Sequence, residues 1–483
     1  MRVERRRLAV GVCAVSLCAL AACGTAARLT RPEGDGGWAP ERRREELSRL
    51  EAAAAGAPEA RGPLTLGDAL ALAERGNRRI AEGERGLAGA RQRVWQARGR
   101  LFPAVTGSGR YTWYTDPQTT RVDFPPGLLP AGVPTPVVVI RQKEFGVLNG
   151  TLNLPLDLTG EIGHALAAAQ AGYRGERARL WATRLAQQVE VIRSYFQLLE
   201  AERLREVTTQ TIALDRQQLA NAQNRFENGR LTKNELLVVQ LALRNAEQRL
   251  LQHGLAVDQA RWTLNETIGL AVDAPSRVVD VRRRPEVPPV EEALRLARAE
   301  NPAVMALLEE QQRLEESATA LVRGRLPRFG AGGAIDYTTS DIVQPRRIGS
   351  GFLGFTWDLG TDTRREAEIA EARIAAERNR LQLERELREL ETAVRSTQRA
   401  AEERLAALAA AEEGVAQAEE NLRIRQQQFD AGRAATDDVL DAEALLAEQR
   451  ATGAAALYQA HTRRAELQQL IGLPLDDVVA DTR

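Results

Sequence analysis

Cysteine and histidine are both scarce in this sequence of 483 residues. The chain has three cysteines, and all of them precede Gly24: Cys13, Cys18 and Cys23. The chain also has three histidines, at widely separated positions: His164, His253 and His461. We therefore expect neither a disulfide framework in the remainder of the chain nor a metal site built from clustered Cys and His ligands.

Net charge of either sign is also missing. Lys and Arg together number 66 and Asp and Glu number 66, with the two signs interspersed along the chain. A neutral, mixed surface argues against a nucleic-acid partner, which would require a basic face. The sequence also contains no nucleophile elbow and no phosphate-binding loop. We expect no enzyme activity and no cofactor.

Long hydrophobic runs are absent except for a short one near the N-terminus. Basic residues from Arg2 to Arg7 precede the apolar segment Leu8 to Ala19. That segment is too short to span a bilayer and is typical of a signal peptide, which we assign to residues 1–22. Leu20-Ala21-Ala22-Cys23 resembles a bacterial lipoprotein box, which implies acylation of Cys23 and a lipid-anchored linker over residues 23–63. Under the alternative, an ordinary signal peptide, Cys23 is incidental.

The rest of the chain contains the same pattern twice. FENGRLTKNELL begins at Phe226, and FDAGRAATDDVL begins 203 positions later, at Phe429. An earlier pair, DALALA from Asp68 and EALRLA from Glu292, and a later pair of Ile-Gly-Leu endings occur in the same order. We infer two repeats, residues 64–286 and 287–483. The first carries an insertion within residues 116–143, where Pro and Gly indicate an irregular loop.

The sequence pattern of each repeat predicts a short helix, two strands, a very long helix, a tight turn and a second shorter helix. The long helices are expected at residues 161–225 and 362–428, and the shorter ones at 66–98, 231–267, 290–322 and 435–470. Apolar residues seven apart predict a coiled coil in the second long helix: Leu387, Val394, Ala401, Leu408, Val415, Leu422 and Phe429.

The predicted strands alternate apolar and polar residues, for example over 105–115 and 147–154. This alternation fits a membrane β-barrel and equally a half-buried soluble sheet. Four strands are too few to close a membrane barrel, whose minimum is about eight, so the membrane interpretation requires several copies of the chain.

These duplicated features resemble the TolC family of outer-membrane efflux and secretion ducts. The resemblance rests on the two Asp/Glu-Ala-Leu starts, the segments LPLDLTG and TWDLGTD, the two Gly-Arg turns and the Ile-Gly-Leu endings. It implies a mixed, mostly α fold with two internal repeats, and a homotrimer with a twelve-strand barrel in the outer membrane and a long periplasmic coiled-coil α-barrel. It also implies docking on a periplasmic adaptor protein and an inner-membrane pump, with no indication of the transported substrate.

By the same resemblance, the Gly-Arg turns are the adaptor-docking tips at Gly229, Arg230, Gly432 and Arg433, and two acids form a periplasmic gate: Asp438 and Asp441. Acids in a first helical turn also simply favour the helix dipole. Glu235 fits that second role better, because Thr232-x-x-Glu235 predicts a capping box. Where the family often has Tyr, this chain has Phe429, so closure requires contacts other than a tyrosine hydroxyl.

Two other functions are compatible with parts of the sequence. A periplasmic adaptor lipoprotein would have an acylated Cys and a helical hairpin, but one hairpin rather than two. A coiled-coil structural lipoprotein would explain the heptads and leave the strands unexplained.

Overall fold

The structure is a computed structural model and describes residues 44, 48–49, 62–122, 125, 137–281, 283–359, 363–431 and 433–475. The chain divides into two units, Met1–Pro58 and Glu59–Arg483. Every element below belongs to the second unit. The predicted signal peptide and Cys23 lie outside the described residues.

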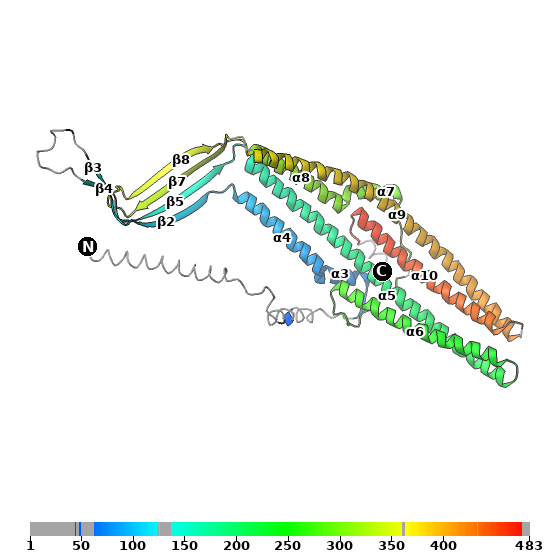
Figure 1. The fold of residues 1–483 in the computed structure, drawn as a ribbon. Helices are drawn as coiled ribbons and strands as arrows, with labels where there is room; N and C mark the ends of the chain where they lie inside the picture. The colour runs from blue at the N-terminus through cyan, green and yellow to red at the C-terminus, as the bar shows by residue number, and fades with distance from the viewer. Residues whose placement is uncertain are drawn as a thin grey trace. The chain divides into compact units, whose positions relative to one another are not determined.

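Apart from two additional strands in the first copy, β3 and β4, the same series of elements occurs twice (Figure 1). The first series is β1 (Pro63–Leu64), α3 (Leu66–Gly76), α4 (Arg78–Gly99), β2 (Ala104–Trp113), β3 (Gln118–Arg121), β4 (Val137–Arg141), β5 (Glu144–Leu156), α5 (Glu161–Glu227) and α6 (Lys233–Ile268). The second is β6 (Arg277–Val278), α7 (Val290–Glu300), α8 (Pro302–Arg323), β7 (Arg328–Thr338), β8 (Arg347–Thr356), α9 (Thr363–Asp430) and α10 (Thr436–Ile471).

The two long helices confirm the sequence prediction. Helix α5 has 67 residues and α9 has 68, so each extends roughly 100 Å at 1.5 Å per residue. On α9 the heptad positions Val394, Ala401 and Leu408 are all buried, which identifies this stripe as the packed face of the helix. No helix among the described residues is both long enough and apolar enough to cross a membrane.

The predicted helices over 66–98 and 290–322 are wrong as single helices, because each is broken at an asparagine. Asn77 separates α3 from α4, and Asn301 separates α7 from α8. The Oδ1 atom of each asparagine accepts hydrogen bonds from the two backbone N–H groups two and three residues later. The side chain thus replaces the helical hydrogen bonds that the first turn of the following helix lacks, and the chain starts a new helix there.

The same two asparagines hold the ends of α6 and α10. The Nδ2 atom of Asn77 donates to the carbonyl of Thr267, and Nδ2 of Asn301 donates to the carbonyl of Leu470. Gly472 ends α10 with a φ of 88° and lies against the backbone between α7 and α8. A Cβ at this position would be only 2.2 Å from the carbonyl oxygen of Glu300. Glycine is therefore required at this position for both its conformation and its size.

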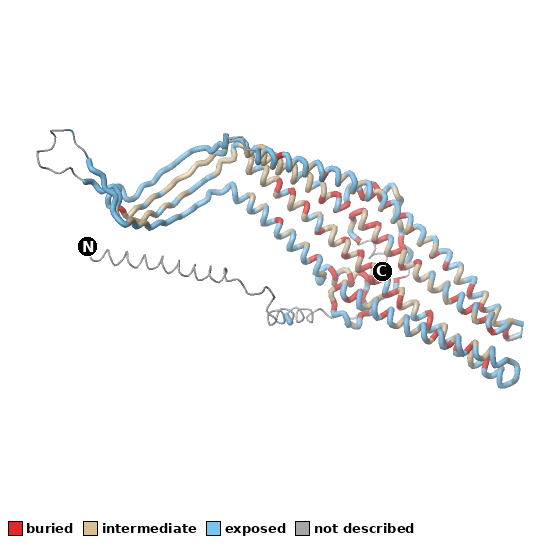
Figure 2. Tube along the Cα trace, viewed as in Figure 1, coloured by how far each residue is buried: buried red, intermediate tan, exposed pale blue. Residues whose placement is uncertain are grey.

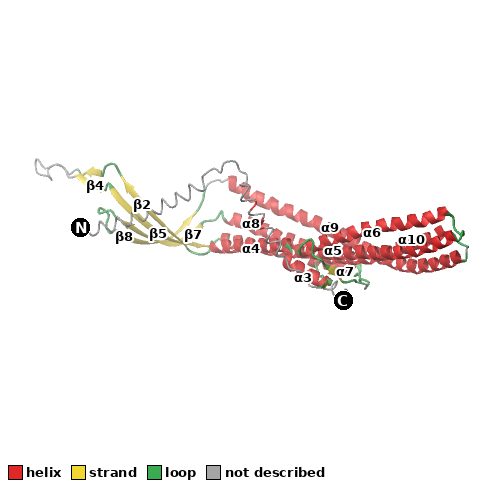
Figure 3. Ribbon diagram, turned by 90° about the horizontal axis from the view of Figure 1, so that it is seen from below, coloured by secondary structure: helices red, strands yellow, loops and turns green. Residues whose placement is uncertain are grey.

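Four strands form one antiparallel sheet in the order β2-β5-β7-β8. They start and end close to the predicted strands and lie at one end of the long helices, whereas the α5–α6 and α9–α10 turns lie at the other end (Figure 3). One face of the sheet is apolar, and its exposed members include Val105, Tyr111, Trp113, Leu148, Leu152, Ile335, Leu353 and Phe355. The opposite face carries polar pairs such as Asn149 with Asp336, whose side chains are 2.6 Å apart.

The insertion differs from the irregular loop that we expected. Strands β3 and β4 pair antiparallel within it. The run Val137-Val138-Val139-Ile140 explains the difference, because β-branched residues favour extended backbone strongly enough to form a ribbon despite the nearby Pro and Gly.

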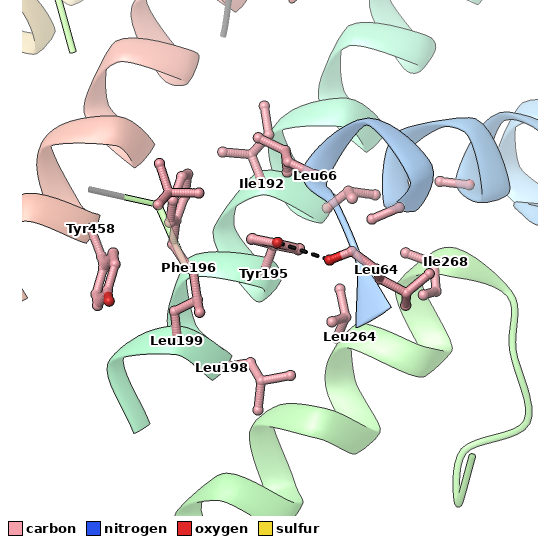
Figure 4. Close-up of a cluster of buried hydrophobic side chains, with 14 of the residues drawn as sticks. Leu64, Leu66, Ile192, Tyr195, Phe196, Leu198, Leu199, Leu264, Ile268 and Tyr458 are labelled. Atoms are coloured by element: carbon pink, nitrogen blue, oxygen red, sulfur yellow. Dashed lines mark hydrogen bonds between the residues drawn. The ribbon is translucent and has the colours of Figure 1, made fainter. Parts of the chain in front are cut away.

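Most buried side chains belong to the helical part rather than the sheet (Figure 2). The largest cluster surrounds Tyr195 and Phe196 of α5 and includes residues of β1, α3, α6 and α10 (Figure 4). The Tyr195 hydroxyl donates to the carbonyl of Leu64 at 3.0 Å or of Val279 at 2.7 Å, and it accepts from the N–H of Val279. Leu64 is the last residue of β1 and Val279 directly follows β6, and these two strands pair in parallel. One phenol therefore fixes both segments to the long helix.

Candidate functional site

The first tip is a helix end of a well-defined type. Helix α5 ends at Glu227 and is capped by Asn228, and Gly229 follows with a φ of 66°. The N–H of Arg230 donates to the carbonyl of Arg225, and the N–H of Gly229 donates to the carbonyl of Phe226. This is the Schellman pattern, in which a left-handed glycine lets two late carbonyls of a helix find donors. Gly229 therefore turns the chain as the sequence predicts.

The second tip shares one of these hydrogen bonds. The N–H of Arg433 donates to the carbonyl of Gln428 at 2.8 Å, which is the equivalent of the bond from Arg230. Gly432 lies outside the described residues, so its predicted role in the turn stays a prediction.

The two tips contact each other through Arg225 and Phe429. The guanidinium of Arg225 lies 4.0 Å from the centre of the Phe429 ring, and its Nη1 donates to the Phe429 carbonyl at 3.2 Å. Phe429 is buried. A cation held over an aromatic face contributes about 0.5–2 kcal/mol. The chain therefore joins its own two hairpins with a contact that needs no tyrosine hydroxyl.

The capping box predicted at the start of α6 is present. The N–H of Glu235 donates to the Thr232 hydroxyl, and the Glu235 carboxylate accepts from both the hydroxyl and the N–H of Thr232. The hydrogen bond from the Thr232 hydroxyl, followed by that from its backbone, lowers the pKa of Glu235. This acid is occupied in starting a helix.

Asp438 makes one of the two hydrogen bonds of a capping box at the start of α10. Its Oδ2 accepts from the N–H of Ala435 at 2.9 Å, although Ala435 has no hydroxyl to return the bond. The other oxygen lies 3.9 Å from Nη1 of Arg425. Asp441, one helical turn later, is exposed. The two carboxylates predicted to form a gate are thus on one helix, and Asp438 also has a local structural role.

Asp441 borders a cavity of about 530 Å³ between α5, α6 and α10. Two buried acids on different hairpins also line it, Asp215 of α5 and Glu443 of α10. Neither acid was predicted from the sequence. The spacing of Thr208, Asp215 and Ala222, seven residues apart and all buried, could have indicated Asp215, because it places an acid at a core position of a heptad.

Burial, followed by the charge of the nearby Asp215 carboxylate, raises the pKa of Glu443 to about 7, against a smaller lowering by the Gln218 amide. Burial also raises the pKa of Asp215, while Arg249 lowers it. Within the described residues, no group of three or more His, Cys, Asp or Glu side chains is arranged to hold a metal ion.

The sheet provides the other functional feature. Strands β2 and β8 are its edges, and each has one neighbouring strand in the described part of the chain. The sheet exposes aromatic and aliphatic side chains on one face, including Trp113 at 72% and Leu353 at 78% exposure. An exposed apolar face is compatible with contact with lipid, where the unpaired backbone groups of the two edge strands would be costly.

Solved structures of similar fold are bacterial outer-membrane proteins. The outer membrane protein VceC of Vibrio cholerae matches with a TM-score of 0.70 at 16% identity, over 84% of this chain and 96% of VceC. CusC, described in terms of transmembrane channel formation, matches with a TM-score of 0.72 at 14% identity, over 87% of this chain and 100% of CusC. The CmeC outer membrane channel of Campylobacter jejuni matches with a TM-score of 0.70 at 12% identity, over 86% of this chain and 90% of CmeC. A search of curated proteins finds no match.

The sequence profile described as outer membrane efflux protein matches twice, over residues 69–270 and 293–473. The two matches together cover most of the chain and correspond to the two series of elements, which confirms the resemblance to TolC-like proteins and the internal repeat. The family consists of channels rather than enzymes. From its repeated architecture, its sheet and these two matches, the chain belongs to the outer membrane efflux protein family.

Proposed function

We propose that the chain is the outer-membrane component of a tripartite efflux or type I secretion system, and that three copies form a duct across the periplasm. One observation carries this proposal: a four-stranded sheet with an apolar face, a polar face and two open edges continues into two long coiled-coil hairpins. Three such sheets joined edge to edge supply twelve strands, enough to close a barrel with the polar faces inward.

The helices also carry apolar surface that a single chain leaves uncovered. On α6, Leu237, Leu241, Leu251 and Leu255 are 50–77% exposed, and their spacings of four and fourteen residues place them on one stripe. On α9, Ile374 and Leu381 are 65% and 61% exposed and seven residues apart. Exposed apolar stripes on α6 and α9 are suited to packing against neighbouring copies of the chain.

The domain boundaries and the anchor belong to the same proposal. Residues 1–22 are the signal peptide, 23–63 a linker that starts at the acylated Cys23, and 64–286 and 287–483 the two repeats. The anchor would hold the protein in the outer membrane, with most of each repeat in the periplasm.

The two tips are proposed as the docking ring for a periplasmic adaptor and, through it, an inner-membrane pump. They lie at the ends of the hairpins furthest from the sheet (Figure 1), which is where a partner coming from the inner membrane would first meet the protein. Gly229, Arg230, Gly432 and Arg433 form the turns of this ring. Asp438 and Asp441 lie just beyond the second turn, in position to narrow an entrance formed by three copies.

Edge-to-edge closure is testable by cross-linking. Ser108 of β2 and Ser350 of β8 lie on the two edge strands, and both are exposed. In the full chain carrying Ser108→Cys and Ser350→Cys, a series of short bifunctional thiol reagents should link chains into a covalent trimer. The linkage would be detected as a band of three chain masses in denaturing gels of outer membranes.

The matched control moves one cysteine away from the edge. Asn149 of β5 lies on the same face as Ser108 and is its register partner, but β5 is an inner strand. Asn149→Cys combined with Ser350→Cys should give little cross-linking between chains with the shortest reagent, because an additional strand spacing of about 4.8 Å separates the thiols. Equal trimer yields from both pairs, or monomers alone from the edge pair, would contradict closure through β2 and β8.

A further inference from the structure

Two carboxylates from different hairpins are buried at the same junction. Asp215 of α5 is 4% exposed and Glu443 of α10 is 3% exposed, and both line the cavity between α5, α6 and α10. The amide Nε2 of Gln218, one turn after Asp215, donates to Oε1 of Glu443 at 3.4 Å. This bond and the shared burial connect the first hairpin to the second.

The surroundings of Glu443 provide no neutralising partner. Its Oε2 has no hydrogen-bond partner within the described part of the chain. Helix α6 contributes Arg249 and His253 to the cavity, but Arg249 acts on Asp215, and Nδ1 of His253 lies 2.9 Å from the Thr208 hydroxyl.

The other charged groups nearby do not compensate Glu443 either. Helix α10 itself contributes two further acids to the cavity, Asp441 and Glu448. On α9, Nη1 of Arg425 lies 3.9 Å from Oδ1 of Asp438, and Glu419 accepts a hydrogen bond from Arg450. The described charges around Glu443 are therefore mostly negative, and the cations among them have other partners.

We propose that Asp215 and Glu443 form a proton latch between the two hairpins: a protonated Glu443 permits the packed α5–α10 junction, and its ionisation loosens that junction. The latch uses contacts within one chain. It therefore goes beyond the proposed duct and does not depend on three copies assembling.

The direction of the pH effect follows from proton binding. Burial, followed by the Asp215 charge, raises the pKa of Glu443 to about 7 in the packed state. In a separated state the carboxyl would be hydrated and its pKa would return to about 4.3. The packed state then binds more protons, so its stability is fully present below about pH 4 and falls as the pH rises to about 7. The ratio of packed to separated hairpins should drop roughly 500-fold from below that window to above it.

The test measures the distance between the hairpins directly. Gln217 of α5 and Leu445 of α10 are exposed and close in sequence to the two acids. Gln217→Cys and Leu445→Cys are introduced together, spin-labelled, and mixed with an excess of unlabelled chain, so that a pulsed electron-spin measurement reports the distance within one chain. The wild-type background should show one short distance at pH 5 and an increasing longer component up to pH 8.

Three substitutions decide whether the latch is responsible. Glu443→Gln keeps the shape and removes the charge, so the short distance should persist at every pH. Asp215→Asn removes a charge that raises the pKa of Glu443, so this pKa should fall in the packed state. The longer distance should then appear in a smaller part of the population, because the ionised Glu443 lacks its repelling neighbour. Glu448→Gln, an exposed acid of the same cavity, is the matched control and should behave as wild type.

A wild-type distance that does not change between pH 5 and pH 8 would overturn the proposal. A Glu443→Gln variant that still opens with rising pH would overturn it equally, since another group would then control the junction. Circular dichroism at both pH values establishes that each variant keeps its helices.

Discussion

Gly229 is the residue whose backbone conformation most directly constrains the tip. Its φ of 66° disfavours any residue with a Cβ, although a Cβ there would meet no atom within 4 Å. Gly229→Val should therefore lower stability by about 1–2 kcal/mol through backbone strain alone. We expect folding to survive and cross-linking to the adaptor to fall, which thermal unfolding and membrane cross-linking would measure.

Gly254 provides a control, because a substitution there should change stability in the opposite direction. It lies inside α6, and a Cβ there would also meet nothing within 4 Å. Gly254→Ala should raise stability by up to about 1 kcal/mol, because alanine favours a helix interior over glycine. If Gly229→Val leaves both stability and adaptor cross-linking unchanged, the turn does not need its left-handed glycine and the docking role is refuted.

The proposed acidic gate can also be tested by substituting single residues, and the hydrogen bond of Asp438 determines which substitution is suitable. Asp438→Ala would remove both the charge and the hydrogen bond from the N–H of Ala435. Asp438→Asn keeps an acceptor for that bond and removes only the charge. With Asp441→Asn, it should weaken cation selectivity and block by multivalent cations in planar bilayers, without lowering thermal stability.

The expected loss follows from the three-fold arrangement that we propose. Six carboxylates near one axis would concentrate negative potential that attracts cations, and salt would screen the attraction. Unchanged selectivity in the double Asn variant would mean that these acids only start α10 and that the constriction lies elsewhere.

At the scale of elements, the β3–β4 ribbon is separable from the sheet. The register of β2 with β5 continues to Trp113 opposite Glu144, and the N–H of Tyr114 donates to the carbonyl of Lys143 at 2.8 Å. The pairing of β2 with β5 is therefore complete before the ribbon begins. Replacing residues 118–141 by a short Gly-Ser linker should leave trimer yield and thermal stability unchanged, as expected for a loop tip that tolerates changes in length.

An epitope in place of the ribbon tests where this part of the insertion lies. We propose that this part of the insertion is extracellular, so an antibody should label intact cells that carry the epitope. The same epitope within the α5–α6 turn should be labelled only after the outer membrane is opened. Loss of assembly on deletion, or labelling of neither variant in intact cells, would count against this assignment.

For the whole molecule, the anchor at Cys23 is the feature to test. Cells grown with labelled palmitate should incorporate label into the wild-type chain, and Cys23→Ser should abolish it while leaving the hairpins and sheet intact. The wild-type protein should fractionate with outer membranes. An unlabelled wild-type chain recovered as a soluble monomer would contradict both the anchor and the proposed assembly.

Many features of this protein are determined by local sequence. The heptad residues of α9 define its buried face, Thr232 and Glu235 start α6, and the left-handed Gly229 ends the turn before it. The alternating strands likewise separate an apolar from a polar face. In each case residues a few positions apart set the pattern, because helix or strand geometry places them on one face or at one helix end.

Other features depend on partners that are distant in the chain. Asn77 and Asn301 break predicted helices because their amides also bond the ends of α6 and α10, and sequence spacing does not show those partners. Glu443 and Asp215 are more than two hundred positions apart, and each alone resembles an ordinary helix acid. Only the packing of α5 against α10 buries the two together, and burial, which is a tertiary property, is what changes their chemistry.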